Sequence, residues 1–129
     1  MIILDHNLPE DQIEQLRRWR IHFRQIGFEV GRPEWDDQQQ ILRYLHTTRQ
    51  VTFFTRDLGF YRRRLCHSNY CLVVLTVPVL ETAGYIRRFL RHPMFRTVAN
   101  RQGRVSKVST DRITFWQAGE QRHVTLGWR

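Results

Sequence analysis

The stretch Ile2-Ile3-Leu4-Asp5-His6-Asn7-Leu8-Pro9 decides how the rest of the chain is interpreted. Three apolar residues run directly into an acid, and so short an apolar run is typical of a strand buried on both faces. Asp5 then lies at the carboxyl end of that strand, the edge at which open α/β sheets bind ligands. A second stretch, Val51-Thr52-Phe53-Phe54-Thr55-Arg56-Asp57, repeats the arrangement. If the two strands are parallel neighbours, Asp5 and Asp57 meet at one edge of the sheet.

Helical and strand patterns alternate along residues 1–92. Asn7 and Pro9 favour a helix start, and apolar residues at three- and four-residue steps continue to Ile26, so that Gly27 ends the helix. Residues 28–30 form a short alternating stretch that favours a strand. A second helix follows Asp36 and Asp37, a third runs from Leu58 to about Leu65, and a fourth covers 81–91. Residues 71–76 form the most continuous strand. This order predicts an α/β fold with a mainly parallel sheet.

The C-terminal third has a different pattern. Residues 95–99, 104–109, 113–117 and 123–126 are short alternating stretches separated by polar turns. Such spacing predicts an antiparallel β meander. We therefore expect a single domain over 1–129, with an α/β core at 1–92 and a β-rich extension at 93–129 that continues or flanks the main sheet.

Composition narrows the class of protein. The chain has 129 residues and 41% hydrophobic content, which suits one globular domain with a real core. The longest apolar runs are only a few residues, which argues against a membrane span, and an acid at position 5 argues against a signal peptide. A cytoplasmic location follows as the expectation. Cys66 and Cys71 lack the spacing of a zinc site, so we interpret them as small buried hydrophobes.

The net charge is +9, from 21 Lys and Arg against 12 Asp and Glu. Lys107 is the only lysine, so the positive charge is almost entirely arginine, which binds phosphate bidentately and stacks on bases. A basic protein of this size favours a nucleic-acid partner. The alternatives are a generally basic surface and an acidic protein partner.

Four acids fall at ends of predicted elements: Asp5, Asp36, Asp37 and Asp57. Carboxylates brought together repel unless a cation lies between them, and hard oxygen ligands suit Mg²⁺ or Mn²⁺. Such ions stabilise charge on a scissile phosphate and generate a hydroxide nucleophile. Each acid taken singly is also a plausible helix cap.

These segments resemble the PIN-like proteins related to VapC-type toxins. Residues 3–9 are similar to the opening "hLLDENLP" of that family, and residues 54–60 are similar to its "hhTRDxDF" segment. Asp36-Asp37 leading into Ile41-Leu42 resembles the helix start "sDeeIL" between them. The resemblance covers about residues 1–92. It implies a three-layer α/β/α fold, ribonuclease activity that depends on Mg²⁺ or Mn²⁺, and the toxin role in a toxin–antitoxin module.

The resemblance also implies roles for single residues. Asp5 and Asp57 match two family acids that hold the metal, and Asn7 matches a residue that supports the site. Two positions depart from the pattern. The second acid of "TRDxDF" is Gly59 here, and the position of the middle acid is Gln38. Asp37 lies one residue away from that position and Asp36 two, so a loop difference would be needed for either to serve as the third ligand.

A basic aromatic segment follows Asp57. Arg56, Arg62 and Arg63 are candidates to hold RNA phosphates, and Tyr61 is a candidate to stack on a base. The alternative is a solvated helix face with Tyr61 in the core. His6 is interpreted as a loop side chain rather than a catalytic base.

Two hypotheses result. The first is a metal-dependent ribonuclease with Asp5, Asp57 and Asp37 as catalytic residues, and with Asp36 as a further candidate ligand. Its expected partners are RNA and an antitoxin protein, with a homodimer as one option for its assembly. The second is a catalytically degenerate PIN-like module that binds RNA or a protein.

Overall fold

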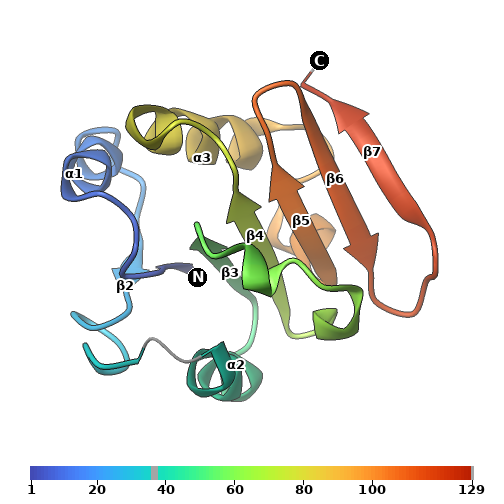
Figure 1. The fold of residues 1–129 in the computed structure, drawn as a ribbon, viewed down its shortest axis with the longest axis horizontal. Helices are drawn as coiled ribbons and strands as arrows, with labels where there is room; N and C mark the ends of the chain where they lie inside the picture. The colour runs from blue at the N-terminus through green and yellow to red at the C-terminus, as the bar shows by residue number, and fades with distance from the viewer. Residues whose placement is uncertain (36–37, 129) are drawn as a thin grey trace.

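A computed structural model describes residues 1–35 and 38–128 of the chain. Over these residues the strands form one seven-stranded sheet in the order β2-β1-β3-β4-β5-β6-β7 (Figure 1). The strands are β1 (Ile2–Leu4), β2 (Arg24–Gln25), β3 (Val51–Thr55), β4 (Tyr70–Leu75), β5 (Arg104–Val108), β6 (Arg112–Gln117) and β7 (His123–Gly127).

The sheet is mostly parallel. Strand β1 pairs in parallel with β2 and β3, β3 pairs with β4, and β4 pairs with β5. Strands β3 and β4 are buried along their whole length, as expected of apolar runs covered on both faces. Strands β5, β6 and β7 pair antiparallel with one another. The predicted α/β class and the C-terminal meander are therefore confirmed, and β5 joins the meander to the main sheet.

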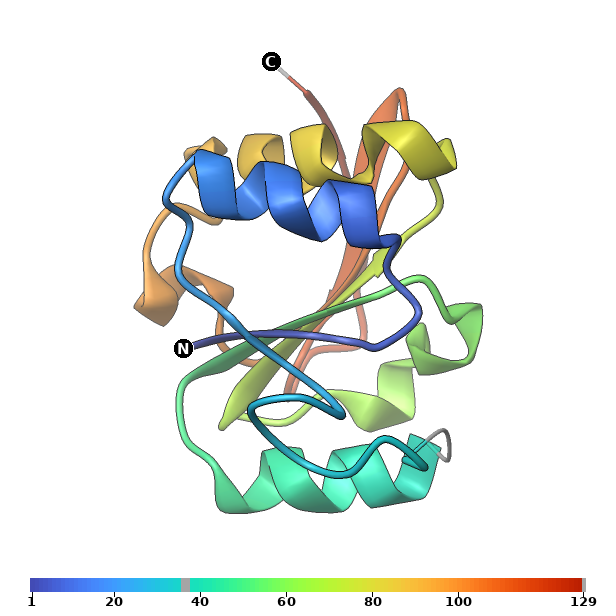
Figure 2. The ribbon, with the colours of Figure 1, turned by 90° about the vertical axis from the view of Figure 1, so that its left-hand side faces the viewer.

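Helices cover both faces of the sheet. Helices α1 (Glu10–Arg18) and α3 (Thr82–Arg91) lie on one face, and α2 (Gln38–Thr47) lies on the other (Figure 2). Two apolar clusters follow this division. The first joins α1 and α3 to residues such as Leu4, Phe54 and Val73, and the second joins α2 to Ile3 and Phe53. Successive side chains of each strand thus enter opposite layers.

The first helix is shorter than predicted. Helix α1 ends at Arg18 rather than near Gly27, because Arg20 adopts a left-handed conformation at φ 59°. The Arg20 N–H donates to the carbonyl of Arg17 at 2.9 Å, and the Ile21 N–H donates to that of Leu16 at 3.1 Å. This is a Schellman ending with arginine at the position that glycine usually occupies.

The segment after α1 also differs from the prediction. Trp19, Ile21 and Phe23 alternate toward the core, and the strand that follows is β2 at Arg24–Gln25. The predicted strand at 28–30 is not formed, because residues 27–29 turn and only Val30 makes an isolated bridge to Ile26. The apolar residues Trp19, Ile21 and Phe23 follow the two-residue spacing of a strand, although with the preceding residues they also fit the spacing of a helix.

Two further predictions were wrong. The helix predicted from Leu58 to Leu65 is two 3₁₀ turns, η1 (Leu58–Phe60) and η2 (Arg63–Leu65). Residues 95–99 do not form a strand, since Thr97 caps the short helix α4 (Val98–Arg101). The reason is the buried Arg101, which donates from Nε to the Thr52 hydroxyl and from Nη1 to the Phe95 carbonyl, both at 2.9 Å.

The remaining boundaries agree with the predictions to within a few residues. A 3₁₀ turn, η3 (Val79–Glu81), precedes α3, and α2 begins at Gln38. The predicted caps of α2, Asp36 and Asp37, lie outside the described residues. Among the helices that are described, none is long and apolar enough to cross a membrane.

Candidate functional site

Two neighbouring parallel strands position the candidate site. Leu4 of β1 pairs with Phe54 of β3, and the Asp5 N–H donates to the Phe54 carbonyl at 2.9 Å. The chain therefore leaves both strands at the same edge of the sheet, as predicted. Asp5 follows β1 directly, and Asp57 comes two residues after the end of β3.

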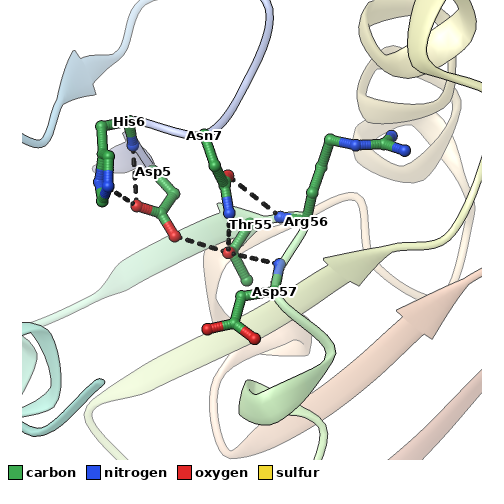
Figure 3. A network of polar contacts seen from close by, with 6 residues as sticks. All are labelled: Asp5, His6, Asn7, Thr55, Arg56 and Asp57. Atoms are coloured by element: carbon green, nitrogen blue, oxygen red, sulfur yellow. Dashed lines mark hydrogen bonds and ion pairs between the residues drawn. The ribbon is translucent and has the colours of Figure 1, made fainter. Parts of the chain in front are cut away.

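Asp5 is a buried carboxylate, only 2% exposed. Its Oδ2 accepts a hydrogen bond from the Thr55 hydroxyl at 2.6 Å. Its Oδ1 accepts from the backbone N–H of His6 at 2.8 Å and lies 2.8 Å from Nδ1 of the same residue (Figure 3). A carboxylate has about four acceptor positions, so these contacts take up most of the hydrogen-bonding capacity of the buried group and leave about one position unused.

The Thr55 hydroxyl connects the two acids. While it donates to Asp5, it accepts from the backbone N–H of Asp57 at 3.0 Å and from the Asn7 side-chain amide at 3.4 Å (Figure 3). The Asn7 carbonyl oxygen in turn accepts from the Arg56 N–H at 3.3 Å. The loops after β1 and β3 are thus held to one another, and the predicted supporting residue Asn7 is one of the links.

Asp57 differs from Asp5 in being exposed. Its Oδ1 caps η1 by accepting from the Gly59 N–H at 2.8 Å. The side chain of Gln38 approaches the same place, since a Cβ added to Gly59 would lie 3.0 Å from Asp57 Oδ1 and 3.6 Å from Gln38 Oε1. The first turn of α2 therefore brings an amide oxygen close to Asp57, at the position where the family pattern has an acid.

Three described residues near this edge of the sheet have side-chain oxygens that could bind a divalent cation. Asp5, Asp57 and Gln38 carry side-chain oxygens of the hard type that Mg²⁺ and Mn²⁺ prefer as ligands. Within residues 1–35 and 38–128, no group of three or more His, Cys, Asp and Glu side chains is placed to hold a metal. Asp36 and Asp37, the other predicted ligands, lie outside that part.

The arginine predicted to bind RNA nearest the acids points away from them. The Arg56 side chain extends toward α3 (Figure 3), where Nη1 donates to the Thr82 hydroxyl at 3.1 Å. Arg62 and Arg63 are exposed on the segment that follows η1.

Tyr61, the predicted stacking residue, contacts the C-terminal strands. Its hydroxyl donates to Thr114 at 2.8 Å and lies 2.6 Å from Nε2 of His123, and Lys107 Nζ lies 5.0 Å from the centre of its ring. Burial raises the pKa of the Tyr61 hydroxyl, which keeps it protonated as a donor. Tyr61 is therefore half-buried against β6 and β7.

Sequence reasoning missed two members of this arrangement. The connecting role of Thr55 could have been found from one feature of the sequence. Thr55 is the last residue of the predicted strand and lies two residues before Asp57. Gln38 could have been found from the spacing of the PIN-like pattern, which places an acid at that position. No family model, curated protein or solved structure matches this chain.

Proposed function

We propose that this protein is a metal-dependent ribonuclease of the PIN-like type, in which Asp5 and Asp57 hold Mg²⁺ or Mn²⁺ at the carboxyl edge of the parallel strands. The observation that supports it most is the Thr55 hydroxyl, which bonds to Asp5 Oδ2 at 2.6 Å and to the Asp57 N–H at 3.0 Å. Two carboxylate residues from different strands are thereby held at one edge, where α/β sheets bind their ligands.

The two acids have different parts in this proposal. Asp5 is buried and restrained by three contacts, so its carboxyl group is held in one position. Asp57 is exposed and uses Oδ1 for the η1 cap. Gln38 Oε1 supplies a neutral oxygen ligand nearby, and Asp37 and Asp36 remain the proposed acidic ones. When bound, the cation would stabilise charge on the scissile phosphate and activate a water molecule.

RNA is the proposed substrate because of the charge of the whole chain. The net charge of +9 and the 21 Lys and Arg residues attract a polyanion to the surface around an acidic edge. The toxin role, with an antitoxin protein as partner, is proposed from the family resemblance. A small reading frame directly upstream that encodes an antitoxin-like protein would support that role.

A second candidate is a PIN-like module that binds RNA or a protein without cleaving it. Gly59 stands where the family pattern has an acid, and two hydrogen bonds and the nearby His6 Nδ1 already occupy the oxygens of Asp5. This candidate predicts RNA binding that is weakened by salt and does not require a divalent cation.

The two candidates are separated by cleavage assays on a panel of RNAs with and without Mn²⁺. The ribonuclease proposal predicts cleavage by the wild type only with the metal, and a loss of activity in both Asp5→Asn and Asp57→Asn. Asp11→Asn is a matched control, because Asp11 is an exposed acid in the first turn of α1. Equal activity in the wild type and both site variants would refute the proposal.

A further inference from the structure

Among the described residues, helices cover only part of one face of the sheet (Figure 1). Helix α2 packs on the cluster that contains Ile3, Phe53 and Val105, and η1 and η2 lie in front of β4 and β5 (Figure 1). Figure 1 shows no described helix in front of β6 and β7 on this side. We name this area, formed by Tyr61, Arg63, Lys107, Trp116 and His123, the β6–β7 platform.

Strand register places the strand residues of the platform on one face. Trp116 pairs with Val105 on one side and with His123 on the other, so the three side chains share a face. Val105 belongs to the α2-side cluster, which identifies that face. Thr114 pairs with Lys107 in the adjacent row, and Tyr61 bonds to both rows through Thr114 and His123.

The platform combines aromatic rings with cations. The ring centroids of Trp116 and His123 are 4.6 Å apart at 44°, and the Arg63 guanidinium lies 5.8 Å from the Trp116 ring. Lys107 lies over the ring of Tyr61. Trp116 is half-buried, whereas Arg63 and His123 are exposed. Aromatic rings beside arginine and lysine are the arrangement on which unpaired bases stack while phosphates bind the cations.

A hollow lies next to the platform. It has a volume of about 580 Å³, lies between η2 and the turn after β6, and is lined by Arg63, Arg64, Cys66 and residues 117–121. Glu120 is the one acid among its lining residues, against two arginines. A basic hollow therefore adjoins the platform at Arg63.

We infer that the β6–β7 platform binds single-stranded RNA, with one base stacked on Trp116 and the flanking phosphates held by Arg63 and Lys107. This inference deepens the proposed ribonuclease function and rests on it for the choice of RNA. The segment 57–66 runs from Asp57 at the acidic edge to Arg63 and the hollow, so one strand of RNA can follow it from the platform to the acids. A duplex presents no free base faces and binds less well.

The test measures the anisotropy of a fluorescent oligouridylate titrated with protein in EDTA, so that no metal-dependent cleavage occurs. Trp116→Ala is expected to weaken binding about 5- to 150-fold, the range for loss of one stacked base. Trp116→Phe keeps an aromatic ring and should lose much less. Arg63→Gln should reduce the salt dependence of binding by about 0.7 in the logarithmic slope, as for one single-strand phosphate contact.

Arg91→Gln is the matched control, because Arg91 is an exposed arginine on α3, on the opposite side of the sheet. It should bind oligouridylate like the wild type. Wild-type affinity in Trp116→Ala, or a loss in Arg91→Gln equal to that in Arg63→Gln, would overturn the inference. Oligoglutamate that competes as well as unlabelled oligouridylate would also overturn it, since it would show a surface for acidic peptides.

The Asp5→Asn variant separates this inference from the proposed function. It should bind oligouridylate in EDTA as the wild type does, while losing cleavage with Mn²⁺. If Asp5→Asn still cleaves RNA but Trp116→Ala fails to bind, the ribonuclease site is wrong and the platform stands. If Asp5→Asn loses cleavage but Trp116→Ala binds oligouridylate like the wild type, the platform is refuted and the ribonuclease site stands.

Discussion

The hydroxyl of Thr55 donates a 2.6 Å hydrogen bond to Oδ2 of Asp5, across two neighbouring parallel strands. Thr55 is fully buried and Asp5 nearly so, which means that the bond forms away from water. A bond to a charged acceptor in such surroundings contributes about 1.5–3 kcal/mol. The position of Asp5 is therefore set by the pairing of β1 with β3.

Thr55→Val tests this contact, because valine has nearly the same shape as threonine but no hydroxyl. The variant leaves one oxygen of Asp5 without its donor and removes the acceptor for the Asp57 N–H. We expect the free energy of unfolding to fall by about 1–3 kcal/mol, measured by urea denaturation. Thr55→Ser retains the hydroxyl and should lose less than half as much. An unchanged free energy of unfolding in Thr55→Val, or a larger loss in Thr55→Ser than in Thr55→Val, would contradict the role of the bond.

Arg20→Gly tests the ending of α1. Arg20 has a φ of 59°, which is strained for a residue with a Cβ and unstrained for glycine. The substitution should raise the free energy of unfolding by about 0.5–1 kcal/mol, even though it removes a charge. The control Arg18→Gly replaces the last residue of α1 and should lower stability, by up to about 1 kcal/mol. Loss of stability in Arg20→Gly would contradict the Schellman ending.

Gly59→Asp introduces an acid at the position where the PIN-like pattern has one. Its Cβ would lie 3.0 Å from Asp57 Oδ1 and 3.6 Å from Gln38 Oε1, so the new carboxylate joins the acidic edge. Like charges at this distance should destabilise the metal-free protein and be relieved by a cation. We expect tighter Mn²⁺ binding by isothermal titration than in the wild type. Gly59→Asn adds similar bulk without charge and should not bind more tightly, and equal tightening in both variants would exclude a charge effect.

The buried thiol of Cys71 should make the free energy of unfolding depend on pH in the alkaline range. Burial raises the pKa of its thiol from 9.0 to about 12 in the folded protein. The unfolded chain therefore loses this proton at lower pH than the folded chain, so stability is full below about pH 9 and falls as pH rises toward 12. The fall attributable to this group is about 1.4 kcal/mol per pH unit.

Cys71→Ala removes that group and should show a shallower loss of stability between about pH 9 and pH 10 in urea denaturation. Tyr70 also lowers the stability of the protein at high pH, because burial raises the pKa of its hydroxyl to about 12. Its effect begins only above pH 10, near the ordinary pKa of 10.0. Identical pH slopes in the wild type and Cys71→Ala would contradict the assignment.

The parallel sheet could be predicted because strands buried on both faces leave a simple signal. Residues 51–55 are all β-branched or aromatic, residues 71–75 form a continuous apolar run, and each stretch lies in an interior strand of the sheet. The meeting of Asp5 and Asp57 at one edge followed from the same signal. These features depend on local composition and on the rule that parallel strands share an edge.

Other features depend on contacts that no local pattern specifies. Helix α1 ends at Arg18, and the left-handed position that follows is Arg20 rather than a glycine, so this turn had no sequence signal. Residues 98–101 are helical because Arg101 is drawn into the core to reach Thr52. The pairing of Trp116 with His123 depends on strand register, which is fixed by the fold as a whole. The acidic edge could therefore be predicted from the sequence, together with Tyr61 and Arg63, whereas the contribution of Lys107, Trp116 and His123 to the platform could not.

The central claim is that Asp5 and Asp57 converge on one divalent cation. Crystals soaked in Mn²⁺ and measured at a wavelength that gives anomalous signal from manganese test it most directly. The account predicts one anomalous peak at the edge of β1 and β3, within about 2 Å of carboxylate oxygens from both Asp5 and Asp57. The same peak should be absent from Asp57→Asn crystals. Saturating Mn²⁺ that gives no peak at this edge, or a peak that contacts neither carboxylate, would contradict the claim.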